Sequence, residues 1–398
     1  MKRFASAALS WCQHSIVMRA IEFTLFFGLL FLSVRTNYQH PEWNFDLVGY
    51  AAVVTSYSTD DPAEIQRRTY KAMREGLPRN DYNKLAGSSP YRKALAKRPE
   101  TLMTQLRLYR NKPMYLAAVS LMHKLGANLA RATFYVSLLA YVLLALLIRW
   151  WLARKVPGPW ASAFCVCLML SHPIFLAARM AAPDMLAALV IVPAMLCLLE
   201  RKWAWGLGLL VLSITVRPDA VLLVGLVCGG LFVWPPEGLR RRTIAGFGVG
   251  ALATYVAIHQ LTAPYPYRVF LKHSLTTRLY EPSRMSEAIT WSEYVEGLRK
   301  SIFVHGYTLY PSPLWLFGML AGVAFFVARR LRDTTTAILV ASCCGYVALH
   351  ILLFPVRNDR YFTGHYLVVA LAALFVMAKL LSSNKPLVEE TPRAIPPP

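Results

Sequence analysis

Three aspartates in this sequence each have an arginine within five residues, at the end of a long apolar run. The pairs are Arg179 with Asp184, Arg217 with Asp219, and Arg357 and Arg360 with Asp359. A carboxylate can accept a proton from a reacting hydroxyl, and a guanidinium can hold an anion through two hydrogen bonds. Ionisable groups beside membrane spans are costly, so their positions are informative. Together with Asp46, which follows the first apolar run, they predict one shared charged cavity. The alternative is that each pair only caps a helix end and neutralises itself.

The elements that position these residues are ten apolar runs. Hydrophobic residues make up 56% of the 398 residues and charged residues 16%, and the mean hydropathy is +0.40. The runs cover residues 16–34, 132–152, 160–178, 183–199, 203–216, 220–234, 243–261, 313–328, 335–354 and 361–381. A bilayer core of roughly 30 Å needs about 17 or more helical residues. We therefore predict an all-α polytopic membrane protein with about ten transmembrane helices. The short runs 203–216 and 220–234 are either tilted spans or one re-entrant pair.

The distribution of basic residues predicts the side on which each short connection lies. One set of alternate connections holds eleven: Arg149, Arg154, Lys155, Arg201, Lys202, Arg240, Arg241, Arg242, Arg329, Arg330 and Arg332. The opposite set holds four: Arg179, Arg217, Arg357 and Arg360. Because cytoplasmic loops carry the excess of Lys and Arg, both termini are predicted in the cytoplasm and the aspartate–arginine pairs at the outer face.

Two long connections remain on the outer side, at about 35–131 and 262–312. In the first of them, residues 113–125 are predicted to form a helix in the membrane interface. Residues 1–381 then form a single transmembrane domain, and the Pro-rich residues 382–398 a disordered cytoplasmic tail. The formal charge of +22 is spread over connections and run ends rather than gathered in one soluble patch. Nucleic acid is therefore excluded as a partner.

Five short segments resemble the GT-C superfamily of membrane glycosyltransferases, which includes protein mannosyltransferases and bacterial lipid-A aminoarabinose transferases. The first runs from Asn44 to Tyr50 and contains Asp46, where the superfamily carries an acidic residue after its first helix. The others are Lys112-Pro113-Met114-Tyr115, Pro183-Asp184 at the start of a middle helix, the Arg217-Pro218-Asp219 turn, and Arg360-Tyr361-Phe362 before the last span. The layout resembles the superfamily over roughly residues 18–381.

The resemblance implies a polyprenyl-phosphate sugar donor and inverting transfer to a lipid, glycan or protein acceptor at the outer face. Asp46 is then the candidate catalytic base, and its alternative is a loop residue at the membrane surface. Arg217, Arg357 and Arg360 are the candidates for holding the donor phosphate, because a guanidinium suits a two-point grip. The cavity-lining candidates are Arg179, Asp184, Asp219, Asp359 and Tyr361.

Many members of the superfamily carry a second acidic residue two positions after the first, where this chain has Val48. No cofactor and no metal ligand is assigned, and use of a divalent metal is left open. The leading hypothesis is a glycosyltransferase of a cell-envelope membrane, for which the absence of any Asn-x-Ser/Thr sequon favours the bacterial inner membrane. The alternative is a transporter or flippase of a lipid-linked glycan. Transporters are expected to place such charges near the bilayer midplane within repeated halves, and no comparable repeat is evident.

Overall fold

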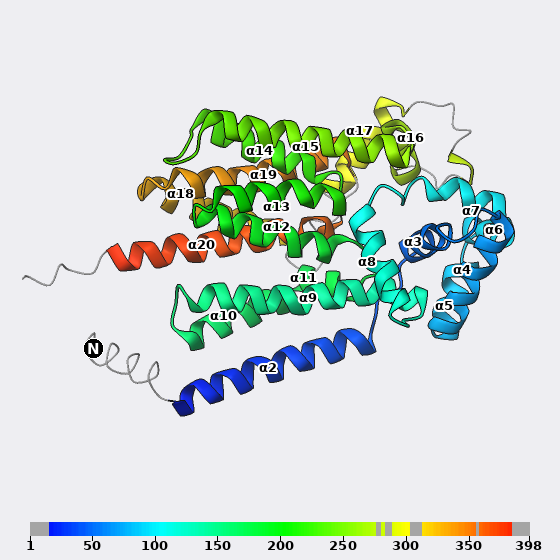
Figure 1. Cartoon of the computed structure of the whole chain (residues 1–398), viewed down its shortest axis with the longest axis horizontal. Coiled ribbons are helices and arrows are strands. Elements are labelled where there is room, and N and C mark those ends of the chain that lie inside the picture. The colour runs from blue at the N-terminus through cyan, green and yellow to red at the C-terminus, as the bar shows by residue number, and fades with distance from the viewer. Residues whose placement is uncertain (1–15, 276–279, 283–288, 303–312, 356–357, 384–398) are drawn as a thin grey trace, which may run out of the picture.

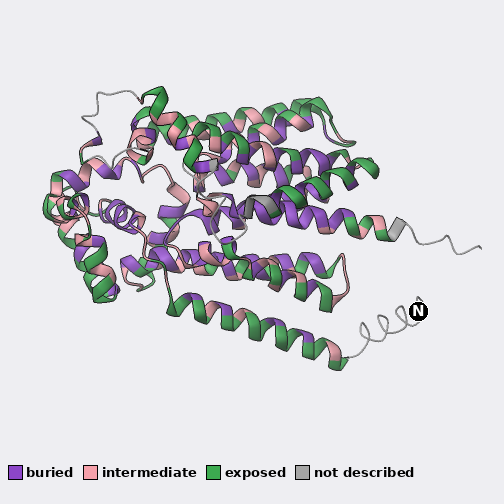
Figure 2. Cartoon of the chain, turned by 180° about the vertical axis from the view of Figure 1, so that it is seen from behind, coloured by how far each residue is buried: buried purple, intermediate pink, exposed green. Residues whose placement is uncertain are grey.

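The structure is a computed structural model that describes residues 16–275, 280–282, 289–302, 313–355 and 358–383. Within these ranges every regular element is a helix, which confirms the all-α class, and Glu42 and Met180 form an isolated parallel bridge. The helices form an elongated bundle with a layer of short helices at one end (Figure 1). Buried residues gather where the bundle helices face one another, whereas α2 (Ile16–Gln39), nearest the N-terminus, is exposed along most of its length (Figure 2).

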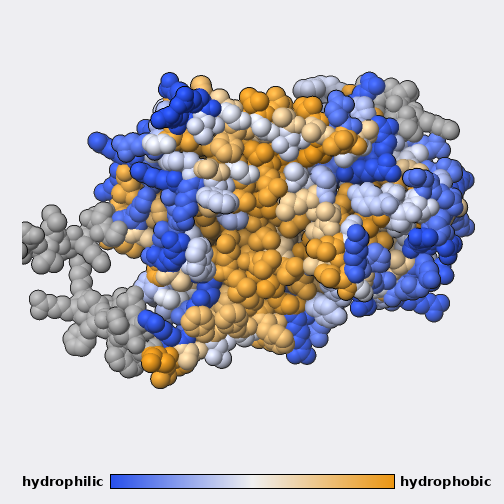
Figure 3. All heavy atoms as spheres, in the orientation of Figure 1, coloured by the Kyte–Doolittle hydropathy of each residue, from blue (hydrophilic) through white to orange (hydrophobic). Residues whose placement is uncertain are grey.

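Five of the described helices are long and apolar enough to cross a membrane. They are α2, α9 (Leu129–Ala153), α15 (Arg241–Thr262), α19 (Thr334–Leu353) and α20 (Thr363–Ser383), the last preceded by the 3-10 turn η3 (Asp359–Phe362). α10 (Gly158–Leu170) and α11 (His172–Arg179) add a sixth span if this bent pair is counted as one. An apolar belt crosses the middle of the visible face between two hydrophilic ends (Figure 3). The described residues thus form an integral membrane protein.

Three further apolar helices are shorter than a bilayer is thick. α12 (Asp184–Leu199), α13 (Trp203–Val216) and α14 (Ala220–Val233) have 16, 14 and 14 residues. At 1.5 Å per residue, 14 residues make about 21 Å of helix, against a bilayer core of roughly 30 Å. These helices pack against α15, α19 and α20 inside the bundle, where α18 (Pro313–Arg330) also packs on α19 and α20. By length and composition, the described part of the chain therefore contains five or six candidate spans, and the predicted number of ten is not confirmed.

The predicted run 160–178 is broken rather than continuous. Ser171 stands between α10 and α11, and Pro173 lies in the first turn of α11. A proline ring lacks the amide hydrogen that would continue the helix and clashes with the preceding turn. The two halves consequently meet at a bend of 64°.

The first long connection folds into a compact helical layer. Its helices are α3 (Asp46–Thr55), α4 (Pro62–Gly76), α5 (Arg79–Gly87), α6 (Pro90–Lys97), α7 (Pro99–Leu106) and α8 (Pro113–Lys124). Four of them begin with proline, whose fixed φ suits the first position of a helix. α8 confirms that residues 113–124 of the segment predicted at 113–125 are helical. Buried residues of α3, α4 and α8 join the same apolar core as the bundle, so the start of α3 is held against the spans.

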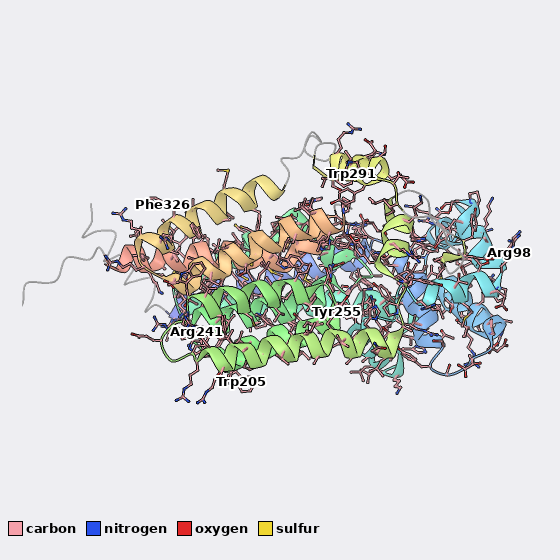
Figure 4. The ribbon with its side chains drawn as sticks, turned by 90° about the horizontal axis from the view of Figure 1, so that it is seen from above. Arg98, Trp205, Arg241, Tyr255, Trp291 and Phe326 are labelled. Atoms are coloured by element: carbon pink, nitrogen blue, oxygen red, sulfur yellow. The ribbon has the colours of Figure 1, made fainter. Side chains whose placement is uncertain are left out.

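The second long connection contains two described helices, α16 (Tyr267–Leu275) and α17 (Trp291–Ile302). Lys272 of α16 pairs with Glu293 of α17 at 2.9 Å. In the view from above, Arg98 of the helical layer and Arg241 at the start of α15 mark opposite ends of the molecule (Figure 4). The predicted tail beyond Ser383 lies outside the described residues.

Candidate functional site

Segments that are far apart in the sequence bring their charged residues together where the bundle meets the helical layer. Asp46 opens α3, Asp184 opens α12, and Arg360 lies in η3. Arg217 and Asp219 occupy the connection between α13 and α14. We call these five residues, together with Lys112 at the start of α8, the charged cluster. α13 ends at Val216 and α14 begins at Ala220, so Arg217 and Asp219 lie at the helix ends that face the cluster.

Arg360 links the helical layer to the bundle. Its Nη2 lies 2.7 Å from Asp46 Oδ2, and its Nε lies 3.5 Å from Asp184 Oδ2. With the Asn44 amide oriented to suit its neighbours, the amide oxygen accepts from Arg360 Nη1 at 2.7 Å and the amide nitrogen donates to the Ala181 carbonyl at 3.2 Å. Arg360 therefore holds the segment that leads into α3, and with it the candidate base.

Arg217 is held by two carboxylates. Its Nη1 pairs with Asp184, and its Nη2 and Nε donate to Asp219 at 2.6 and 3.0 Å. Asp219 Oδ2 also accepts from the Tyr346 hydroxyl at 2.7 Å and lies 3.5 Å from His350 Nδ1. Although burial alone would raise it, the Arg217 guanidinium lowers the pKa of Asp219 below its usual range. Asp184 thus contacts both arginines, Arg217 and Arg360. Asp219 accepts two hydrogen bonds from Arg217 and so fixes the orientation of its guanidinium group.

Tyr361 lies against both guanidinium groups. Its ring centroid is 4.8 Å from Arg217 Cζ and 5.3 Å from Arg360 Cζ. A cation over an aromatic face is stabilised by the ring quadrupole, more strongly when water is excluded. The Tyr361 ring therefore packs against both guanidinium groups of the cluster.

Lys112 belongs to the cluster and was not among the predicted site residues. Its Nζ donates to Asn111 at 2.9 Å and lies 5.7 Å from the ring centroid of Tyr50. Burial, with the nearby Arg217 charge, lowers the pKa of Lys112 to about 8 against the opposing pull of Asp46, Asp219 and Asp184. The proline that follows it, at the start of α8, is the sequence signal that could have placed it at a helix end pointing into the site.

Two predicted cavity residues have other roles. Arg179 donates to the His40 carbonyl at 2.6 Å and lies 4.0 Å from Glu42, whose amide donates back to the Arg179 carbonyl at 2.9 Å. These contacts fix the segment after α2, which leads to Asp46. Asp359 accepts from Tyr366 at 3.2 Å. Arg357 lies outside the described residues.

The cluster is neutral and closed on itself. Its cations are Arg217, Arg360 and Lys112, and its anions are Asp46, Asp184 and Asp219. The side chains of Asp46 and Asp219 keep 29% and 27% of their surface exposed, whereas Asp184 keeps 3%. An incoming anion that binds Arg217, or Nη2 of Arg360, would take the place of a carboxylate.

The donor set does not suit a metal ion. Each carboxylate of the cluster already faces a guanidinium. Over the described ranges, no group of three or more His, Cys, Asp or Glu side chains is arranged to hold a metal.

Comparisons of the chain with family models, curated proteins and solved structures return no match. The functional assignment therefore depends on the chemistry of the cluster and on the five segments that resemble the GT-C superfamily. Each of those five segments contributes at least one residue to the cluster: Asp46, Lys112, Asp184, Arg217 with Asp219, and Arg360.

Lys112 is expected to react with an amine-acetylating reagent near neutral pH. With a pKa of about 8, about a quarter of the Lys112 amines are neutral at about pH 7.5, compared with about one in a thousand for an ordinary lysine. Mass spectrometry of the acetylated full chain should give a labelling midpoint near pH 8 at this residue. In the variant Lys112→Arg the acetylated peptide should disappear, which identifies it. Labelling that still rises steeply at about pH 10 would contradict the lowered pKa.

Proposed function

We propose that this chain is a membrane glycosyltransferase of the GT-C type, which moves a sugar from a polyprenyl-phosphate donor to a lipid, glycan or protein acceptor. One observation carries the proposal: five segments that resemble this superfamily, spread from Asp46 to Arg360, meet in one charged cluster. A chance likeness of short motifs has no reason to converge in space. The cluster supplies what transfer from a sugar phosphate needs, namely a carboxylate and several cations.

The proposed topology places this chemistry at the outer face of the membrane, with both termini in the cytoplasm. The α9–α10, α12–α13, α14–α15 and α18–α19 connections lie at the end of the bundle opposite the helical layer (Figure 1). The eleven basic residues lie in these connections or in the helix ends beside them. An excess of Lys and Arg is typical of cytoplasmic connections. In a bacterial inner membrane the cluster would then face the periplasm. The short helices α12 to α14 and α18 would supply the remaining passes of a ten-helix bundle.

In the proposed reaction, the acceptor hydroxyl oxygen forms a bond to the anomeric carbon of the sugar from the face opposite the phosphate. The bond between that carbon and the phosphate oxygen breaks, and its electron pair leaves with the polyprenyl phosphate. Asp46 takes the hydroxyl proton. Arg217, Arg360 and Lys112 neutralise the charge that develops on the departing phosphate.

Donor binding and activation of the base are coupled in this arrangement. Asp46 and the donor phosphate compete for Arg360, which holds Asp46 at 2.7 Å. When the phosphate takes that guanidinium, the Asp46 carboxylate loses its ion-pair partner and can accept a hydrogen bond from the acceptor hydroxyl. Asp46 is thus free of its ion pair with Arg360 only when a donor occupies the site. In the empty site the carboxylate stays paired and does not act as a base.

The proposal is tested with the full chain reconstituted in liposomes that contain a polyprenyl-phosphate-linked sugar, labelled on the sugar, and a cell-envelope extract as acceptor source. We expect the labelled sugar to appear in a new product, and free polyprenyl monophosphate to accumulate in an equal amount. A transporter or flippase would instead move the intact donor between leaflets without releasing polyprenyl monophosphate. That second result would overturn the proposal.

A further inference from the structure

A series of contacts connects the last helix to the guanidinium group of Arg217. His365 of α20 stacks on Tyr346 of α19, with ring centroids 4.0 Å apart and 7° between the ring planes. The Tyr346 hydroxyl donates to Asp219 Oδ2 at 2.7 Å. Asp219 in turn accepts from Nε and Nη2 of Arg217 at 3.0 and 2.6 Å. Two aromatic rings therefore lie behind the carboxylate that orients Arg217.

A glycine precedes each of these two rings in the sequence and allows its helix to pack closely. A Cβ at Gly345 would lie 3.2 Å from a side-chain atom of α14, and a Cβ at Gly364 would lie 3.3 Å from a backbone atom of α12. Glycine suits such a close approach because it has no side chain. The packing of α19 on α14 places Tyr346 beside Asp219, which lies directly before α14.

The two rings are closed off from the space that a bound anion would occupy. Tyr346 and His365 are each 2% exposed, whereas the side chain of Asp219 keeps 27% of its surface exposed. An anion in the charged cluster could contact Arg217 but not Tyr346. Any effect of Tyr346 on such an anion must therefore act through Asp219.

The orientation of the Asp219 carboxylate depends on Tyr346. A carboxylate with a single partner can turn about its bond to Cβ together with that partner. The Tyr346 hydroxyl gives Oδ2 a second donor, and the next neighbour, His350 Nδ1, lies farther away at 3.5 Å. Hydrogen bonds to a charged acceptor are stronger than those between neutral groups. Tyr346 thus holds the plane of the carboxylate, and the carboxylate holds the plane of the Arg217 guanidinium.

His365 contacts Tyr346 through the face of its ring. Neither ring nitrogen of His365 has a hydrogen-bond partner among the described residues. Stacked aromatic rings stabilise each other beyond the area that they bury. His365 therefore restricts the Tyr346 ring as a flat surface rather than as a hydrogen-bonding group.

We propose that Tyr346 is a positioning residue for the anion that binds in the charged cluster, and that His365 holds its ring in place. Through Asp219, Tyr346 fixes the edge of Arg217 formed by Nε and Nη2, which leaves Nη1 directed at Asp184 and the incoming phosphate. The identity of that phosphate, a polyprenyl-phosphate donor, rests on the proposed function. The orientation of Arg217 does not.

The first measurement uses Tyr346→Phe in the reconstituted full chain, because this change removes only the hydroxyl. We expect the KM for the polyprenyl-phosphate sugar to rise roughly fivefold while kcat changes by less than about twofold, since Arg217 grips the donor less well in both ground and transition states. The matched control is Tyr141→Phe. Tyr141 is also buried, and its hydroxyl donates to the Met169 carbonyl at 3.2 Å in another part of the bundle. It should leave both constants unchanged.

Two variants of His365 test the stacking contact. His365→Phe keeps a flat ring and should leave the KM within about twofold of the unsubstituted chain, whereas His365→Leu should raise it roughly threefold. If both variants raise the KM equally, the ring nitrogens hold Tyr346 and the stacking role is wrong.

A second measurement separates this inference from the proposed function. The full chain is labelled with isotope-labelled arginine in phosphatidylcholine nanodiscs, and the NMR signals of Arg217 are assigned by their loss in Arg217→Lys. Exchange between its two Nη groups should be slow in the unsubstituted chain and in Tyr141→Phe, and faster in Tyr346→Phe. A chain that transfers no sugar would refute the proposed function, and the exchange rates would still decide the role of Tyr346. Unchanged exchange in Tyr346→Phe, or an unchanged KM in an active chain, would overturn the positioning role.

Discussion

Replacement of Asp46 by asparagine is expected to lower transfer by roughly 100- to 10,000-fold, the range that loss of a general base produces. Asparagine keeps the size of the side chain but cannot take the acceptor proton. The same change removes the carboxylate that competes for Arg360 at 2.7 Å. Binding of polyprenyl monophosphate should therefore be unchanged or tighter in Asp46→Asn. A binding assay and a transfer assay on one preparation separate the two effects.

The matched control for this variant is Asp333→Asn. Asp333 also pairs with a basic side chain, Lys379 at 2.6 Å, but it lies in the connection between α18 and α19 at the other end of the bundle. It should leave both transfer and binding unchanged. Full transfer activity in Asp46→Asn would remove Asp46 as the base. Loss of donor binding together with loss of activity would assign Asp46 a structural role in holding Arg360.

Much of the helical layout could be predicted from runs of apolar residues. The run 203–216 coincides with α13, since Lys202 and the Arg217-Pro218 pair bound it so sharply. The helices of the first long connection are harder to predict, because they are short and amphipathic and each buries only one face. The prolines at the starts of α4, α6, α7 and α8 were present in the sequence as signals for it.

The partners of the charged residues could not be predicted from neighbours in the chain. Asp184 was paired with Arg179, five residues away, whereas its partners are Arg217 and Arg360. Arg179 ends α11 and Asp184 begins α12, and Arg179 contacts Glu42 and the His40 carbonyl instead. Partners from 33 and 176 positions away are set by helix packing, which periodicity along one segment does not encode. The alternative that every acid is neutralised by its nearest arginine is therefore wrong for Asp184.

Lys112 is a second residue whose place in the cluster could not be predicted from its neighbours in the sequence. The first long connection contains several lysines, and Lys112 is the one that is followed by proline. What distinguishes Lys112 is that α8 packs on α3, α9 and α13, which carries its amine to Asp46 and Arg217. The distinction arises from tertiary packing and appears in the sequence only as the Lys-Pro step before α8.

Replacement of Arg217 by methionine is expected to destabilise the protein by about 3–5 kcal/mol, the cost of leaving one member of a buried ion pair without its partner. Asp184 is 3% exposed and would keep only the 3.5 Å contact with Arg360. Asp219 suffers less, because it is 27% exposed and retains the Tyr346 hydroxyl and His350. Denaturant unfolding of the chain in detergent micelles measures the loss.

The double variant Arg217→Met with Asp184→Asn decides whether the buried carboxylate is the cause. Removing the stranded charge should recover a large part of the lost stability, although donor binding stays impaired because the guanidinium is absent. Removing Asp184 alone leaves Arg217 paired with Asp219 at 2.6 Å and should cost less than removing Arg217 alone. If the double variant is no more stable than Arg217→Met, the loss of stability comes from the α13–α14 connection, where Asp219 no longer has Arg217 as its partner. In that case Asp184 does not hold the two arginines together. The cluster would then depend on the turn that carries Arg217 rather than on the bridge between helices.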